Sequence, residues 1–219
     1  MTDNVNTPYH YVAQIDDLKR APDFQKDIFM FPQLNGDDSR RKPMSPSSDE
    51  KINDMEPINK IAVPSDWNKD VSESGFGDVS KSVSFSPPDA VGSELSIYDR
   101  GYPIAKSEAE KFKAVLDKEP HVLDENEIDG LSEQVLGTSV GDRSAFDLKH
   151  AETKVINGKK VLTVEGDWKE GGKKFYGMFI PKDENFRDIQ EVFYEGTEPN
   201  FSKFRPEADK AISSIHWKN

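Results

Sequence analysis

The chain has 219 residues and is strongly acidic, with 41 Asp and Glu residues against 29 Lys and Arg residues and a formal net charge of −12. This balance excludes a nucleic-acid-binding protein that depends on phosphate contacts and docking on an anionic membrane through net charge, because both need an excess of Lys and Arg. The absence of cysteine excludes disulfides, thiolate catalysis and cysteine-ligated zinc or iron–sulfur centres.

The first thirty residues contain no readable targeting signal. They hold five aspartates and no apolar run of the roughly seven residues that a secretory signal needs. No window of the sequence approaches the ~20 apolar residues of a membrane-spanning helix. We therefore expect a cytoplasmic protein by default, with membrane association only through a partner.

Residues 1–57 are predicted to form an irregular, partly disordered extension ahead of a folded domain over residues 58–219. The polar Pro- and Ser-containing stretch at 40–50 buries too little apolar area to offset the entropy that ordering removes. Within the extension, apolar side chains nevertheless cluster over residues 24–34. The members of this cluster are Phe24, Ile28, Phe29, Met30, Phe31 and Leu34.

A dense apolar cluster in a polar segment is typical of a segment that docks. Two docking surfaces remain open: the chain's own domain, or another protein on which the segment becomes ordered. On the second interpretation, these six residues bind the partner, and deleting residues 1–57 leaves the stability of the domain nearly unchanged.

From residue 58 the pattern is that of β-strands with one wet face. Residues 80–86 alternate serine with Val83 and Phe85, and residues 94–98 repeat the alternation around Leu95. Period-two alternation predicts an antiparallel sheet with one face in the core and the other in solvent.

Two helices are predicted to follow these strands. The first begins at a capping box formed by Ser107 and Glu110 and ends before Pro120. The second begins at Asp124 and ends before Gly137, which suits a helix C-terminus.

The last third of the chain is predicted to hold the centre of the sheet. Asn157-Gly158 predicts a two-residue hairpin turn, because both residues tolerate positive φ. Residues 175–180 are apolar on both faces, which places Phe179 in a central strand. A further strand and a C-terminal helix complete the domain.

No catalytic or metal-binding arrangement stands out. The four histidines form no H-x-H or H-x-x-x-H pair, and the calcium-like loop at 124–130 has Leu136 where a bidentate Glu is required. Gly75-Phe76-Gly77 lacks the rest of a phosphate-binding loop, and no G-x-S-x-G nucleophile motif is present. We therefore predict no catalytic residue, no metal ligand and no cofactor.

The three tryptophans lie near the ends of predicted elements. They are Trp67, Trp168 and Trp217. Two interpretations remain open: the rings close the ends of the core, or they are exposed aromatic contacts for a partner.

The motifs of residues 58–219 also follow a known order. Residues 61–69, Ile-Ala-Val-Pro-Ser-Asp-Trp-Asn-Lys, form an apolar strand that ends in proline and a tryptophan-containing turn. The serine-alternating strands, the Asn157-Gly158-Lys159 hairpin and a closing helix come after it. In this order the domain resembles the PsbP/Mog/DcrB-like superfamily.

The resemblance implies an α+β fold, with an α/β/α sandwich around an antiparallel β-sheet, and a non-catalytic role in binding another protein. The superfamily includes the extrinsic photosystem II protein PsbP, Ran-binding Mog-type proteins and bacterial DcrB-like proteins, among them chaperones of type VI secretion effectors. The metal-site histidines of plant PsbP and the Ran-binding signature have no match here. No site residue and no role in nuclear transport are therefore carried over.

Three functions follow as hypotheses. The first is a non-enzymatic accessory or adaptor protein that binds a larger protein complex through its N-terminal extension and one face of the sheet. The second is a cytoplasmic DcrB-like chaperone or immunity-type binder of a single client, for which an acidic surface suits a basic client. The third is a hydrolase with a carboxylate site, which requires a pocket where Asp or Glu side chains of displaced pKa converge.

Overall fold

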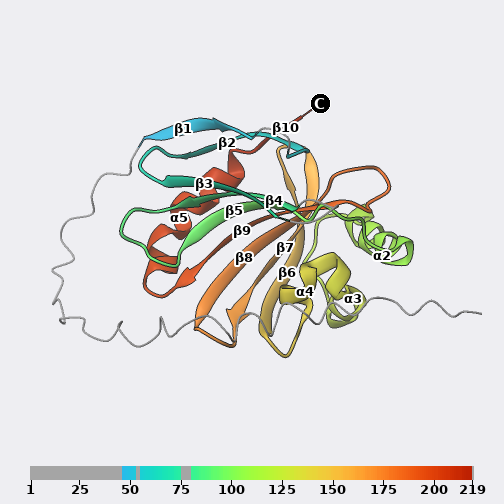
Figure 1. Ribbon diagram of the computed structural model, residues 1–219. Coiled ribbons are helices and arrows are strands. Elements are labelled where there is room, and N and C mark those ends of the chain that lie inside the picture. The colour runs from blue at the N-terminus through green and yellow to red at the C-terminus, as the bar shows by residue number, and fades with distance from the viewer. Residues whose placement is uncertain (1–45, 53–54, 75–79, 219) are drawn as a thin grey trace, which may run out of the picture. The chain divides into compact units, whose positions relative to one another are not determined.

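The computed structural model of the chain describes residues 46–52, 55–74 and 80–218, which all belong to one compact unit. Its main feature is a seven-stranded antiparallel sheet in the order β3-β4-β5-β9-β8-β7-β6 (Figure 1). In chain order these strands are β3 (Asn68–Ser74), β4 (Ser80–Ser86), β5 (Glu94–Asp99), β6 (Phe146–Ile156), β7 (Lys159–Trp168), β8 (Lys173–Pro181) and β9 (Ile189–Thr197).

Within the described ranges, a smaller antiparallel sheet and the helices α2 to α5 accompany the large sheet. The small sheet has β2 between β1 and β10. Its strands are β1 (Ser47–Lys51), β2 (Ile58–Pro64) and β10 (His216–Trp217). The helices are α2 (Lys106–Asp117), α3 (Glu125–Gly130), α4 (Glu133–Gly141) and α5 (Asn200–Ser213). The prediction of an α+β fold with antiparallel pairing is thereby confirmed.

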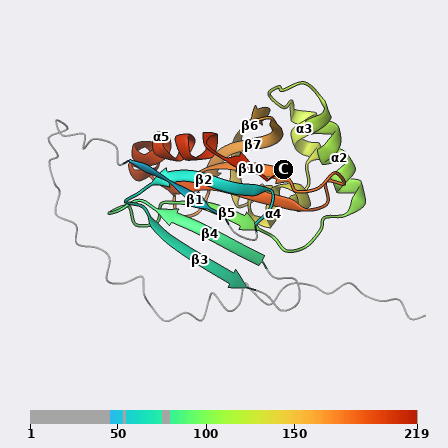
Figure 2. The ribbon, with the colours of Figure 1, turned by 90° about the horizontal axis from the view of Figure 1, so that it is seen from above.

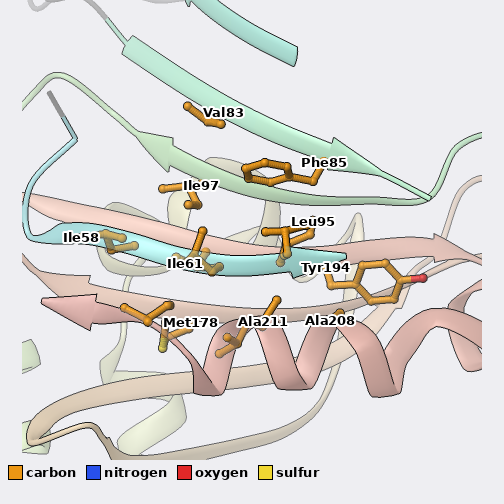
Figure 3. Close-up of a cluster of buried hydrophobic side chains, with 14 of the residues drawn as sticks. Ile58, Ile61, Val83, Phe85, Leu95, Ile97, Met178, Tyr194, Ala208 and Ala211 are labelled. Atoms are coloured by element: carbon orange, nitrogen blue, oxygen red, sulfur yellow. The ribbon is translucent and has the colours of Figure 1, made fainter. Parts of the chain in front are cut away.

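The small sheet and α5 cover one face of the large sheet. Ile61 of β2 and Ala211 of α5 share a buried cluster with Leu95 and Tyr194 of the large sheet (Figure 3). Small residues on α5 let the helix approach closely, and the alternating apolar side chains of β4 and β5 point into this cluster. We call it the first core cluster.

The other face is covered by α2, α3 and α4, which pack over β6, β7, β8 and part of β9. Phe112 of α2, Val135 of α4 and Phe179 of β8 belong to this second core cluster. Figures 1 and 2 show α2 and α3 at one side of the large sheet and β3 at the other. The second core cluster includes no residue of β3, β4 or β5 among the described residues.

Two details of the predicted sheet are confirmed. Asn157 and Gly158, between β6 and β7, have positive φ angles of 47° and 87°. The missing Cβ of Gly158 faces open space, so the backbone conformation rather than crowding favours glycine here. Phe179 is 1% exposed in β8, and this strand lies between β7 and β9 in the sheet.

The predicted helix starts and lengths are partly wrong. α2 begins at Lys106, and its N-cap residue is Ala105, which has no side-chain oxygen to cap the helix. Ser107 lies inside the helix, so the predicted capping box at Ser107 is not formed. The second helix is two helices. α3 starts at the predicted Asp124 capping box but ends at Gly130, and Ser132 then caps α4.

Part of the predicted extension belongs to the small sheet. β1 pairs with β2 along its full length, from Ser47 opposite Pro64 to Lys51 opposite Lys60. Side chains between β1 and β2 enter the first core cluster, so the packed unit includes residues before position 58. The predicted docking cluster, Phe24, Ile28, Phe29, Met30, Phe31 and Leu34, lies outside the described residues.

Candidate protein-binding surface

One face of β3, β4 and β5 lies outside both core clusters and is lined by polar side chains. Its position follows from the alternation, since Val83 and Phe85 of β4 point to the first core cluster and the serines between them point the other way. The strand register places Ser72 of β3 opposite Ser82 of β4 and Ser84 of β4 opposite Ser96 of β5 on this face. We call it the serine face; it consists of Asp70, Ser72, Ser82, Ser84, Glu94, Ser96 and Tyr98.

Hydroxyl pairs join the strands across the serine face. Ser72 Oγ lies 3.0 Å from Ser82 Oγ, and Ser84 Oγ lies 2.7 Å from Ser96 Oγ. Ser72 is exposed, Ser82 and Ser84 are half-buried, and Ser96 is buried. Such cross-strand hydrogen bonds satisfy the hydroxyl groups while leaving a surface of short polar side chains.

Carboxylates gather where β5 meets β9. Burial raises the pKa of Glu94, and the nearby charges of Glu195 and Asp70 raise it further against the opposing effect of Lys173. Glu195 accepts from Lys173 Nζ at 2.6 Å and from Trp168 Nε1 at 3.0 Å. This end of the serine face therefore carries negative charge, which suits a basic partner surface.

A buried ion pair marks the border between the serine face and the helices. Tyr98 lies opposite Glu191 in the β5–β9 ladder. Glu191 accepts from Arg100 Nε at 2.5 Å, and the same guanidinium donates from Nη2 to the Val135 carbonyl at 2.7 Å and from Nη1 to the Gln134 carbonyl. The pair thus holds the first turn of α4 against the sheet.

The Arg100 pair also bears on the hydrolase hypothesis. Burial raises the pKa of Glu191, while Arg100 lowers it. The described surface has one cleft of about 570 Å³ beside the β6–β7 hairpin and one of about 380 Å³ beside α3. Neither Glu94 nor Glu191 lines either of these clefts. These two clefts therefore bring together neither of the described carboxylates whose pKa is raised.

The described part of the chain also bears on metal binding and on membrane-spanning helices. Over residues 46–52, 55–74 and 80–218, no three His, Asp or Glu side chains are grouped to hold a metal ion. In the same part of the chain no helix is long and apolar enough to cross a membrane.

The structure places Trp67 in the first core cluster. The residue is 8% exposed, and its ring lies edge-on to Phe204 at 6.3 Å and tilted against Tyr194 at 6.4 Å. Little of this ring is left for a partner.

The other two tryptophans are half-buried. Trp168 packs edge-on against Phe146 and Phe175, with ring centroids 5.0 and 5.8 Å apart. Trp217 packs against the first core cluster and donates its Nε1–H to the Ile156 carbonyl at 2.8 Å. The structure brings none of the three tryptophans onto the serine face.

Sequence reasoning predicted a serine-lined wet face but missed the Arg100–Glu191 pair. The serine alternation is a local signal, visible within seven residues. Arg100 and Glu191 are 91 positions apart, and their pairing depends on β5 lying beside β9, for which the sequence offers no local signal.

Comparison with known proteins does not show a family for this chain. No protein-family model and no curated protein matches it. Among solved structures, a Pseudomonas aeruginosa protein of unknown function is similar at 12% identity with a TM-score of 0.37. The match covers 80% of this chain and 99% of the other. A similarity of this strength carries no functional conclusion.

Proposed function

We propose that this protein is a non-enzymatic accessory or adaptor protein that binds a larger protein complex through the serine face and the N-terminal extension. The observation that carries the proposal is the unequal cover of the large sheet. Among the described residues, α2, α3 and α4 close one end of the sheet, whereas β3, β4 and β5 contribute nothing to the second core cluster. The layers also support the finer assignment to an α/β/α sandwich of the PsbP type.

The edge of β3 adds backbone groups to the proposed surface. β3 pairs with β4 on one side, and no described strand pairs with its other side. A free edge offers N–H and C=O groups to an extended partner segment. Lys69, Asp70 and Glu73 are exposed along it, and such charges discourage self-association of an edge.

Charge defines the kind of partner. The chain has a net charge of −12, and Asp70 and Glu94 belong to the serine face. We therefore propose a partner that presents a basic surface to this face. Complementary charge raises the association rate and disfavours acidic partners.

Co-purification from the native host tests this proposal with two matched variants. Ser82→Arg places a cation on the serine face, and Ser213→Arg places the same group on an exposed position of α5. We expect Ser82→Arg to lose at least about tenfold of the recovered partner through like-charge repulsion, while Ser213→Arg retains it. Melting curves of both variants verify that they fold.

Two results would decide against the adaptor role. A solitary protein in a gentle lysate contradicts partner binding, and equal recovery with both variants contradicts the serine face. Recovery of one basic client in a one-to-one ratio would instead support the single-client chaperone or immunity-type binder.

A further inference from the structure

The two edge strands of the seven-stranded sheet, β3 and β6, differ in backbone pairing. At the β6 edge, residues 121–123 run alongside the strand. Leu123 donates its N–H to the Ala151 carbonyl at 2.9 Å, and Thr153 donates its N–H to the His121 carbonyl at 2.8 Å. At the opposite edge, β3 pairs with β4, and no other described residue bonds to its backbone. In the described part of the chain, β3 is therefore the open edge of the large sheet.

Val71, in the middle of β3, is the exposed end of a buried row of apolar side chains. The strand register places Val71 opposite Val83 of β4. The same row continues through Ile97 of β5 and Val192 of β9. The three inner side chains are at most 6% exposed, whereas Val71 is 61% exposed. An apolar side chain on a strand beside β3 would extend this row and bury Val71.

The charged side chains on either side of Val71 already have partners. Lys69 and Glu73 share the face of Val71, because side chains two positions apart in a strand point the same way. Lys69 pairs with Glu50 of β1 at 3.0 Å, and Glu73 pairs with Lys81 of β4 at 3.3 Å. Both charges are thereby compensated within the chain, and Val71 lies between them as an uncovered apolar side chain.

The other face of β3 belongs to the serine face and presents Asp70 and Ser72. The hydroxyl of Ser72 is paired with that of Ser82 at 3.0 Å. Asp70 is exposed and forms no hydrogen bond or ion pair with another described residue. Burial raises the pKa of Glu94, and the charges of Glu195 and Asp70 raise it further. A cation on a strand beside β3 would offset this excess of negative charge.

We propose that an extended segment of the partner protein adds to the open edge of β3 as an antiparallel strand, with an apolar side chain opposite Val71 and a lysine or arginine opposite Asp70. Antiparallel pairing continues the pattern of the described sheet. Side chains of the added strand alternate between its two faces, so the apolar residue meets the buried row and the basic residue meets the serine face.

The register of β3 predicts a short sequence pattern in the partner. An antiparallel strand passes Ser72 first, then Val71, then Asp70. The pattern is therefore serine or threonine, then a β-branched apolar residue, then lysine or arginine. Backbone hydrogen bonds provide most of the attraction, and the alternate side chains set the register. The inference rests on the proposed function, since it takes the partner to be a protein that binds beside the serine face.

Hydrogen–deuterium exchange and fluorescence anisotropy with the full-length chain test this edge. The probe is the labelled, end-capped peptide Ser-Thr-Thr-Val-Lys-Thr-Ser. We expect β3 to exchange rapidly in the protein alone and to become protected when the peptide binds, because its outward amides gain partners. Two N-methylated peptides carry the methyl groups on opposite sets of alternate residues. One should bind and the other should not, since only one set of amides faces β3.

Two valine variants provide the matched comparison. Val71→Ser is expected to weaken peptide binding about tenfold, because the apolar contact is lost. Val155→Ser removes the same side chain from β6, where it is 50% exposed, and is expected to change nothing. Asp70→Lys should weaken this peptide and strengthen a peptide with glutamate in place of its lysine. Melting curves verify that the three variants fold.

Four results would overturn the inference. They are protection of β3 in the protein alone, which would show the edge paired by this chain or a second copy, and no peptide binding to the folded protein. The others are equal binding of the two N-methylated peptides and equal affinity in Val71→Ser and Val155→Ser. Any of these, with partner recovery still lost in Ser82→Arg, would leave the proposed function standing. Peptide binding as expected, with recovery unchanged in Ser82→Arg, would remove the serine face and retain the edge.

Discussion

At one end of the seven-stranded sheet, side chains pack on both faces of the strands, and at the other end they pack on one face. The sequences of the strands reflect this difference. In β8 every residue from Phe175 to Pro181 is buried, because the first and second core clusters enclose the strand from both sides. In β4 only Val83 and Phe85 are buried, and serines occupy the other face. A continuous apolar run is thus typical of a strand that is buried on both faces, and alternation is typical of a strand that is buried on one face.

This contrast separates stability from the proposed recognition surface. The doubly covered strands carry most of the buried aromatic contacts, including the Phe146, Trp168 and Phe175 group. The serine face contributes short hydrogen-bonded side chains instead. Substitutions in the first region are expected to change stability, and substitutions in the second are expected to change binding.

Removing side chains from the first core cluster should have the largest effect on stability. Deletion of residues 1–57 takes away β1 together with Ile52 and Met55, which are each 2% exposed in the first core cluster. We expect a loss of about 4 kcal/mol or more in the free energy of unfolding, since each such side chain contributes about 2–5 kcal/mol. Urea denaturation measures it.

Deletion of residues 1–45 is the control, because it leaves every described residue in place. If the Phe24–Leu34 cluster docks on a partner, this shorter deletion abolishes complex assembly with a nearly unchanged melting temperature. A large fall in melting temperature with assembly intact would show an intramolecular strap instead.

The second prediction compares the two regions directly. Phe179→Ala, in the doubly covered strand β8, should cost about 3–5 kcal/mol through lost burial and the cavity left behind. Ser72→Ala, on the serine face, should cost about 1 kcal/mol or less, because it removes one solvent-exposed hydroxyl pair with Ser82. Similar losses for both variants in urea melts would contradict the contrast between the regions.

Arg100→Ala tests whether the buried ion pair between the serine face and the helices stabilises the domain. This change leaves the buried Glu191 carboxylate unpaired and frees the first turn of α4, so we expect a loss of about 3–5 kcal/mol. The double variant Arg100→Met with Glu191→Leu should recover most of the loss, because no charge remains buried. A single-variant loss below about 1 kcal/mol would show that α4 is held by its apolar contacts alone.

The smallest predicted effect is a pH dependence at the N-terminus of α3. Lys118, 2.6 Å away, holds the pKa of Glu127 at about 2, and the hydrogen bond to Glu127 raises the pKa of His121 above its ordinary 6.5. The Glu127 contribution is present above its unfolded pKa, ordinarily 4.5, and is lost as the pH falls toward 2. The His121 contribution is complete below 6.5 and is lost as the pH rises through the raised pKa.

Both contributions are therefore complete together only between pH 4.5 and 6.5. NMR titration of His121 measures the pKa directly. In Glu127→Gln the pKa of His121 should fall relative to the wild type, and an unchanged value would contradict the assigned contact.

Sequence reasoning anticipated what local patterns encode and missed what distant contacts decide. The Asn157-Gly158 turn, the buried run around Phe179 and the serine alternation of β4 each depend on neighbours within a few residues. The break between α3 and α4 was missed, although Ser132 is a recognisable cap, because the apolar spacing continues across it. β1 was missed because its pairing with β2, rather than burial of apolar side chains, holds it in the sheet.

The most direct test of the serine face as a binding surface is zero-length cross-linking of carboxylates to lysines in the native complex, read by mass spectrometry. A basic partner on this face should give links to Asp70 and Glu94, with the links reduced in Ser82→Arg and retained in Ser213→Arg. Links confined to acids elsewhere, such as Asp49 of β1 or Asp209 of α5, would contradict the account.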